Sequence, residues 1–131
     1  MKFATFTSDD KTFYGAVTHD GMIALNEVFP QWPTLFDAVQ ADALAELSDA
    51  VKGRSVTHAN FQFEMVLPNA QRILCVGVNF PDRNAEYKDG SDQPKYMSLF
   101  PRFAMGFTGH NRPLIRPPES HQLDYEGEVA I

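Results

Sequence analysis

Proline is distributed unevenly along this chain of 131 residues, and this distribution limits the possible folds more than any other feature. Six of the nine prolines lie between positions 80 and 131. Proline lacks a backbone N–H and its ring clashes with the preceding helical turn, so it breaks helices and is excluded from central strands. Residues 80–131 are therefore expected to form turns and extended segments, and regular structure is expected mainly in the first 70 residues.

Alternating side chains predict three strands near the start of the chain, at residues 2–8, 12–18 and 22–28. A turn, Asp9-Asp10-Lys11, separates the first two. The motif His19-Asp20-Gly21-Met22 separates the second and third, and its Asp-Gly pair is typical of hairpins because both residues tolerate positive φ. The sequence therefore predicts an antiparallel meander.

A helical region is expected between Thr34 and Gly53. The Thr34 hydroxyl can accept a backbone N–H, and Asp37 suits the positive end of a helix. Asp42 can instead cap a second short helix, so the pattern leaves one helix or two open. Apolar residues recur there at helical spacing: Leu35, Phe36, Val39, Ala43, Leu44, Leu47, Ala50 and Val51.

The expected fold class is α+β. A further strand is predicted at residues 61–67, and Pro68-Asn69 ends it. We place a boundary there, which divides the chain into a small N-terminal α/β module, residues 1–70, and the start of a mainly-β domain, residues 71–131. With 44% apolar and 21% charged residues, the chain can bury a core.

Charge and hydropathy exclude several classes of protein. Eleven basic and seventeen acidic residues give a net charge of −6, which argues against nucleic acid and anionic membranes as partners. No apolar run approaches the ~20 residues of a membrane span, and the N-terminus turns polar too early for a secretory signal. The single cysteine, Cys75, fits a reducing compartment. A cytoplasmic globular protein is expected.

Three acidic side chains alternate near the end of the chain: Asp124, Glu126 and Glu128. On a strand they would share one face, about 6.8 Å apart. Neighbouring carboxylates raise one another's pKa unless a cation lies between them, and a hard divalent ion fits that role. The alternative is an edge strand whose acids discourage aggregation. The apolar residues 129–131 indicate a buried strand, which adds support for the metal and leaves both alternatives open.

A second polar group follows the apolar run at residues 72–78. Arg83 and Glu86 are three residues apart, so on a helix they share a face. Polar side chains at the carboxyl end of a strand often form sites. The alternative is a surface ion pair.

Five short segments follow one another in the second half of the chain. They are Cys75-Val76-Gly77-Val78-Asn79-Phe80, Glu86-Tyr87, Leu99-Phe100-Pro101-Arg102, Gly109-His110 and Leu123-Asp124-Tyr125-Glu126-Gly127-Glu128. Their order and spacing resemble the fumarylacetoacetate hydrolase family. The resemblance is greatest to the bacterial branch of 2-keto-4-pentenoate or 2-oxohepta-3-ene-1,7-dioate hydratase-like proteins. It covers residues 72–131 and, less closely, the N-terminal module.

The resemblance implies a divalent-metal-dependent enzyme that cleaves or rearranges a small α-keto acid or β-diketone, as in the catabolism of aromatic compounds. Glu126 and Glu128 would be the metal ligands, usually for Mg²⁺ and sometimes for Mn²⁺ or Ca²⁺. Arg102 would bind a substrate carboxylate, and Glu86 matches an acidic residue that activates water. The family also implies a homodimer.

The sequence departs from the family at two points. Arg83 occupies the position of an expected histidine, and arginine cannot act as a general base near neutral pH. Either Glu86 acts alone, another group serves, or the reaction is not a water-driven hydrolysis. His110 is a candidate for that group and for substrate binding, and the alternative is a histidine that only forms part of a turn. The family also has a third carboxylate, an aspartate, further along than residue 131. The resemblance therefore predicts the N-terminal portion of a longer enzyme, and the alternative is a truncated, non-catalytic binding or assembly module.

Overall fold

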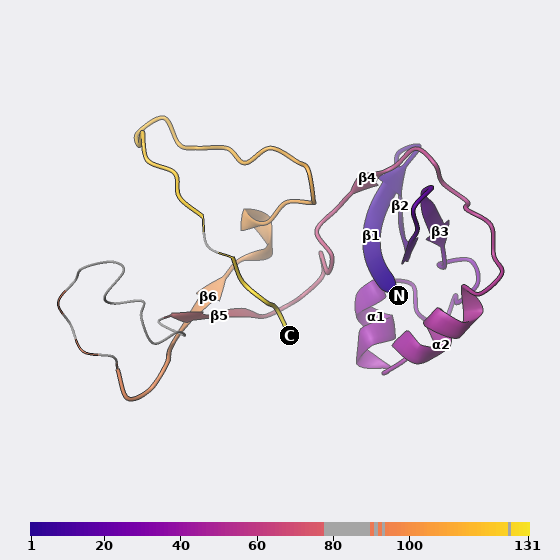
Figure 1. Cartoon of the computed structure of the whole chain (residues 1–131), viewed down its shortest axis with the longest axis horizontal. Helices are drawn as coiled ribbons and strands as arrows, with labels where there is room; N and C mark the ends of the chain where they lie inside the picture. Colours follow the sequence, from indigo (N-terminus) through magenta and orange to yellow (C-terminus); the bar gives the residue numbers. More distant parts are fainter. Residues whose placement is uncertain (78–89, 91, 93, 126) are drawn as a thin grey trace.

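The computed structural model describes residues 1–77, 90, 92, 94–125 and 127–131. These residues form two antiparallel sheets and three short helices, which confirms the α+β class (Figure 1). No helix in the described part of the chain is long and apolar enough to cross a membrane. The elements are β1 (Lys2–Ser8), β2 (Lys11–Val17), β3 (Met22–Ala24), α1 (Leu35–Gln40), α2 (Leu44–Ala50), β4 (Gln62–Phe63), β5 (Ile73–Gly77), β6 (Ser98–Arg102) and the 3₁₀ helix η1 (Ala104–Gly106).

The first sheet has the strand order β3-β2-β1-β4 and contains the predicted meander. Asp9 and Asp10 both have positive φ, 48° and 59°, as a tight hairpin turn requires. The third strand is shorter than predicted and ends at Ala24. The chain turns there because the Val28 and Phe29 N–H groups both donate to the Leu25 carbonyl.

The helical region forms two helices rather than one. Thr34 makes the predicted capping box, since its hydroxyl accepts the Asp37 N–H and the Asp37 carboxylate accepts the Thr34 N–H. Asp42 does not cap α2: its φ is 55°, and Ala43 occupies the N-cap without a side-chain hydrogen bond. The left-handed residue between the two helices breaks the helical hydrogen-bond ladder.

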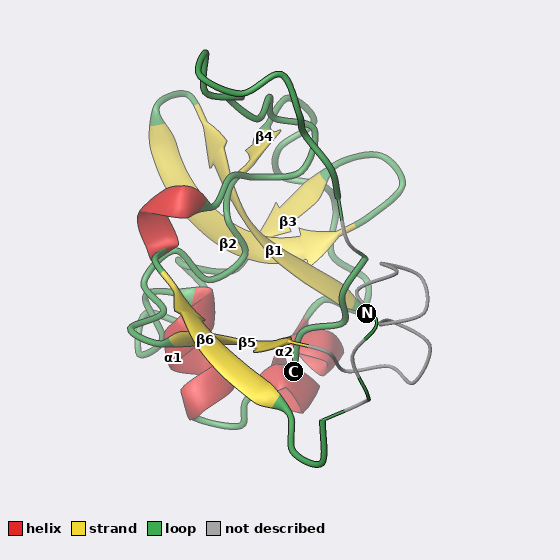
Figure 2. Cartoon of the chain, turned by 90° about the vertical axis from the view of Figure 1, so that its left-hand side faces the viewer, coloured by secondary structure: helices red, strands yellow, loops and turns green. Residues whose placement is uncertain are grey.

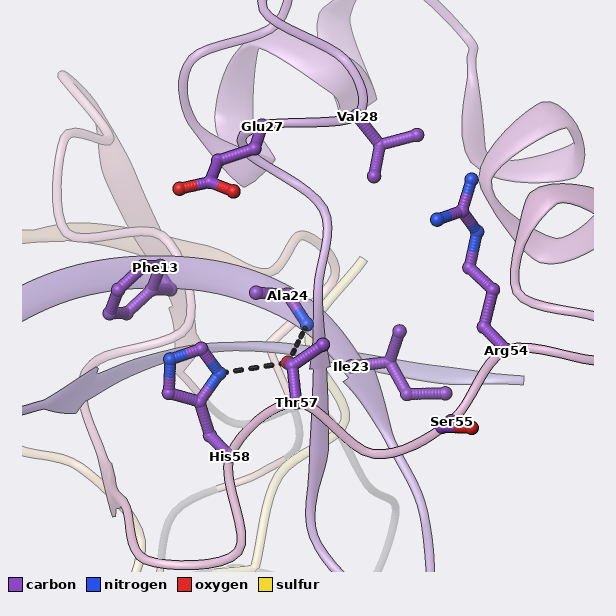
Figure 3. A pocket seen from close by; sticks show the side chains of 9 residues that line it. All are labelled: Phe13, Ile23, Ala24, Glu27, Val28, Arg54, Ser55, Thr57 and His58. Atoms are coloured by element: carbon purple, nitrogen blue, oxygen red, sulfur yellow. Dashed lines mark hydrogen bonds between the residues drawn. The ribbon is translucent and has the colours of Figure 1, made fainter.

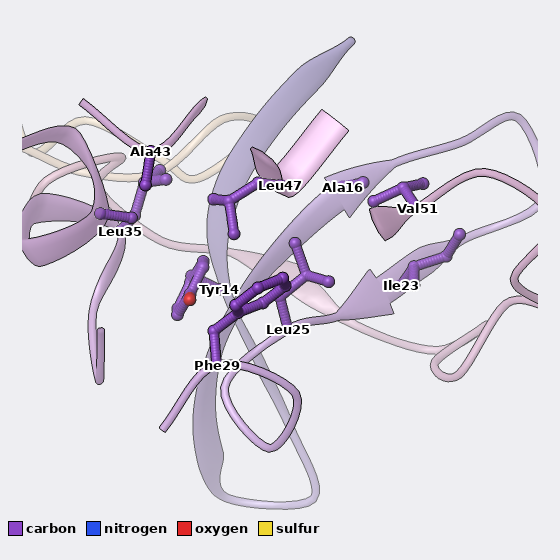
Figure 4. Close-up of a cluster of buried hydrophobic side chains, with 10 residues drawn as sticks. Tyr14, Ala16, Ile23, Leu25, Phe29, Leu35, Ala43, Leu47 and Val51 are labelled. Carbon is purple, nitrogen blue, oxygen red and sulfur yellow. The ribbon is translucent and has the colours of Figure 1, made fainter. Parts of the chain in front are cut away.

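The first sheet is covered on both faces. Helices α1 and α2 pack on one face over a cluster of buried side chains (Figure 4). The other face buries Ala4, Phe6 and Met22 beneath partly buried phenylalanines. The helix-side cluster consists of Tyr14, Ala16, Ile23, Leu25, Phe29, Leu35, Ala38, Ala43, Leu47 and Val51.

Tyr14 is buried in the helix-side cluster, where its side chain is 1% exposed. Its hydroxyl has no hydrogen-bond partner among the described residues. Burial, and to a lesser extent the negative charge of Asp37, raises the pKa of the Tyr14 phenol above its ordinary value of 10.0. The unfolded chain therefore releases this proton at a lower pH than the folded chain does.

We expect the stability of the protein to fall as the pH rises above 10 and the folded Tyr14 keeps a proton that the unfolded chain has lost. Below pH 10 both states hold the proton and this contribution is constant. The substitution Tyr14→Phe should remove this part of the alkaline destabilisation, and Tyr96→Phe, at an exposed position, should not. Urea unfolding at neutral and alkaline pH measures the difference. If the free energy of unfolding falls equally at alkaline pH in the wild type and in Tyr14→Phe, the expectation is contradicted.

The second sheet consists of β5 and β6 alone among the described strands. The predicted strand at residues 61–67 is reduced to the two residues of β4.

The prediction of a strand at the end of the chain is wrong for the described residues there, because they have no regular secondary structure. Val129 is 89% exposed there. An extended segment needs a neighbouring strand to pair its backbone, and none of the described strands pairs with this segment.

Candidate substrate and metal site

Three of the six predicted site residues lie outside the described residues: Arg83, Glu86 and Glu126. The structure describes the other three, Arg102, His110 and Glu128. All three are exposed, and they lie in three different environments.

Arg102 lies at the end of β6, opposite Ile73 of β5. Figure 2 shows these two strands of the second sheet. Its guanidinium carbon lies 4.8 Å from the centre of the Phe100 ring. The two side chains share a face because they are two residues apart on a strand. The aromatic ring supports the cation without neutralising it, so Arg102 is available to a carboxylate.

His110 lies in a turn that contacts the first sheet. Its ring meets the ring of Phe63 in β4 edge to face, with the centroids 5.5 Å apart. The turn is closed by a hydrogen bond from the Arg112 N–H to the Gly109 carbonyl, 3.1 Å long. Arg102 and His110 therefore have different aromatic neighbours.

Glu128 lies in the irregular segment at the end of the described chain. The described residues, which do not include Glu126, hold no group of three or more His, Cys, Asp or Glu side chains arranged for a metal ion. By chemistry the donors fit, because the carboxylate oxygens of Glu126 and Glu128 are the ligand type that Mg²⁺, Mn²⁺ and Ca²⁺ prefer.

An open depression of about 370 Å³ lies elsewhere, beside β3 (Figure 3). None of the three described site residues, Arg102, His110 and Glu128, lines it. His58 stands at its edge with its ring 4.5 Å from that of Phe13. The Thr57 hydroxyl oxygen lies 2.8 Å from His58 Nδ1 and accepts the Ala24 N–H at 2.8 Å. These contacts hold the segment at residues 57–58 against the edge of β3, so His58 has a structural role there.

Sequence reasoning missed the pairing of Arg112 with Glu64. A terminal nitrogen of Arg112 contacts Glu64 Oε1, and Arg112 Nε donates to the Phe63 carbonyl at 3.2 Å. Forty-eight residues separate the two charged side chains. No local pattern marks such a pair, so no sequence signal was available.

The second half of the chain is similar to a known protein family. Residues 72–131 match the family model described as the C-terminal domain of fumarylacetoacetate (FAA) hydrolase. This segment is therefore similar to the fumarylacetoacetate hydrolase family that the five motifs resemble.

Two curated relatives are both named oxaloacetate tautomerase. The mitochondrial oxaloacetate tautomerase fahd2 of Xenopus laevis is 27% identical over 140 residues, which cover 100% of this chain and 43% of that protein. The oxaloacetate tautomerase YisK of Bacillus subtilis is 33% identical over 64 residues, which cover 47% of this chain and 21% of that protein. The chain thus spans less than half the length of these relatives.

A solved structure has the same fold over most of the chain. It is a candidate HpcE protein from Mycobacterium smegmatis, with a TM-score of 0.67 at 21% identity. The similarity covers 87% of this chain and 40% of the other. Because 87% of the chain is more than either half alone, the shared fold includes residues from both halves.

Proposed function

We propose that the chain belongs to a fumarylacetoacetate hydrolase-family enzyme that rearranges a small dicarbonyl acid, with oxaloacetate as the first substrate to test. The family match of residues 72–131, which contain Glu126-Gly127-Glu128, carries this proposal. Two relatives named as oxaloacetate tautomerases support the choice of substrate. Their names favour tautomerisation over the hydratase chemistry that the motifs first suggested.

The departure at Arg83 supports the same choice. A hydrolase must activate water, and arginine cannot take the proton from it near neutral pH. A keto–enol tautomerisation needs no water: one proton leaves the carbon beside the carbonyl, and one proton is added to the carbonyl oxygen. A single carboxylate such as Glu86 can take the carbon-bound proton, which leaves Arg83 free to bind an anionic group.

The other predicted site residues would bind the metal ion or the substrate. Glu126 and Glu128 would hold the divalent cation, which polarises a substrate carbonyl as a Lewis acid when bound. Arg102, fixed over Phe100, would pair with a carboxylate of the substrate. His110 would contact the substrate from the turn at residues 109–112.

Metal binding tests the first part of the proposal. Calorimetric titration with Mg²⁺ or Mn²⁺ should give saturable binding to the chain and none to the Glu126→Ala, Glu128→Ala double variant, because both carboxylate donors are removed. Glu119→Ala is the matched control, since it removes an exposed acid from the same half of the chain. Binding that survives in the double variant, or is absent from the wild type, would contradict the proposed ligands.

Turnover tests the second part. The enol form of oxaloacetate absorbs ultraviolet light, so its conversion can be followed with and without metal. If metal accelerates the conversion of oxaloacetate by the wild type and this acceleration is lost in the double variant, the proposed enzymatic function is supported. Metal binding without acceleration would favour the alternative, a binding or assembly module.

Many large apolar side chains are exposed in the second half of the chain, and this observation favours that alternative. A second copy of the chain is the proposed partner, and sedimentation equilibrium would detect the dimer. The most exposed are Tyr96, Phe103, Met105, Ile115, Tyr125, Val129 and Ile131, each 74% or more exposed.

A further inference from the structure

Strand β4 lies at the edge of the first sheet and, among the described strands, pairs only with β1, through Phe6–Phe63 and Thr7–Gln62. The other edge of a strand presents unpaired backbone groups. Here the turn at residues 109–112 contacts that strand, since Arg112 Nε donates to the Phe63 carbonyl at 3.2 Å. The second half of the chain thus contacts the first sheet at this strand.

The approach of the turn is so close that it requires glycine at position 109. A Cβ atom on Gly109 would overlap the Phe63 carbonyl group and lie 2.9 Å from the Glu64 Cα. Gly109 is buried, and the turn passes through Asn111 at φ 62°. Asparagine is among the residues that tolerate this left-handed conformation. The local sequence therefore suits the contact.

An ion pair reinforces the contact. The Arg112 guanidinium meets Glu64 Oε1, and the two side chains are only 30% and 26% exposed. The Thr7 hydroxyl donates to the same oxygen at 2.9 Å, which ties the pair to β1. Removing one partner would leave a partly buried charge without its counter-charge, which is costly. The pair therefore resists separation of the turn from the sheet.

His110 lies inside this anchored turn, with its ring against Phe63. We propose that Glu64 and Arg112 are positioning residues that hold the His110 imidazole at the edge of the first sheet. The consequence for substrate binding rests on the proposed function. In this arrangement the N-terminal module helps to place a substrate-binding group that the second half of the chain supplies.

A double-mutant cycle tests the ion pair. Glu64→Gln and Arg112→Gln should each accelerate hydrogen exchange of the Arg112 amide by roughly tenfold, because each leaves one charge unpaired. The double variant should exchange no faster than either single variant. The His110 ring proton shifts, which the nearby Phe63 ring perturbs, should move toward free-histidine values in the single variants. If the effects of Glu64→Gln and Arg112→Gln on the exchange rate are additive in the double variant, Glu64 and Arg112 are not coupled.

Gly109→Ala provides an independent test that changes no charge. It should displace the turn and shift the His110 ring resonances, whereas Gly106→Ala, with nothing within 4 Å of its added Cβ, should not. If Arg112→Gln and Gly109→Ala both leave the His110 resonances unchanged, the proposal is wrong.

The oxaloacetate assay separates this proposal from the proposed function. In an active protein, Arg112→Gln should raise KM several-fold with a smaller change in kcat, because it misplaces a binding group. An unchanged KM would overturn the positioning role. If the wild type neither binds metal nor turns over oxaloacetate, the proposed function fails, and hydrogen exchange and the His110 shifts still decide whether the two residues position the ring.

Discussion

Replacing Phe6 with alanine is expected to lower the free energy of unfolding by about 3–5 kcal/mol. Phe6 is fully buried on β1 and forms the centre of an aromatic cluster. Its ring lies 5.5 Å from Phe13, 5.9 Å from Phe61 and 5.4 Å from the His58 imidazole, centroid to centroid. Neighbours from β2 and from the loop before β4 cannot close a cavity of that size, because their own strands and contacts hold them apart.

Urea unfolding of the Phe6→Ala variant measures this loss. Phe103→Ala is the matched control, since it removes the same side chain at a position that is 74% exposed. It should change the free energy of unfolding by less than about 0.5 kcal/mol. Similar losses for the two variants would show that the face of the sheet around Phe6 is not a core.

Replacing Gly15 with alanine is expected to destabilise the first sheet by about 3 kcal/mol or more, the upper end for overpacking. Gly15 pairs with Ala24 across the β2–β3 ladder. An added Cβ would overlap the Ile23 carbonyl group and lie 3.0 Å from the Ala24 Cα. These neighbours are backbone atoms, so a side-chain rotation cannot relieve the clash, and β3 must move away from β2.

Hydrogen exchange locates this effect. The Leu25 N–H donates to the Tyr14 carbonyl at 2.9 Å, and its protection should fall in Gly15→Ala together with the overall stability. Gly106→Ala, where an added Cβ meets nothing within 4 Å, should leave both unchanged. If Gly15→Ala keeps wild-type protection at Leu25, the β2–β3 spacing has room that the structure does not show.

The N-terminal elements were largely predictable because their signals are local. The Asp9-Asp10 and Asp20-Gly21 turns occupy the expected positions, and Thr34 caps α1 with Asp37 as predicted. Capping and tight turns depend on residues within a few positions of one another, so the sequence carries them directly. The number of helices was left open because the break at Asp42 depends on one left-handed residue.

The pattern at the end of the chain was less informative. Alternation of Asp124, Glu126 and Glu128 predicted a strand. Alternation, however, does not show whether a second strand is present to pair with it. The described residues around it have no partner strand and remain irregular. The predicted ligand roles of Glu126 and Glu128 rest on family resemblance and stay predictions, as does the boundary at residue 70.

The sequence by itself determined the α+β class, the first hairpins and the family resemblance of residues 72–131, because short-range signals and ordered motifs specify them. Only the tertiary structure decided that β4 closes the sheet beside β1 and that Arg112 reaches Glu64 there. Contacts across 48 residues depend on how the two halves of the chain pack, and a pattern read along the chain does not contain that information.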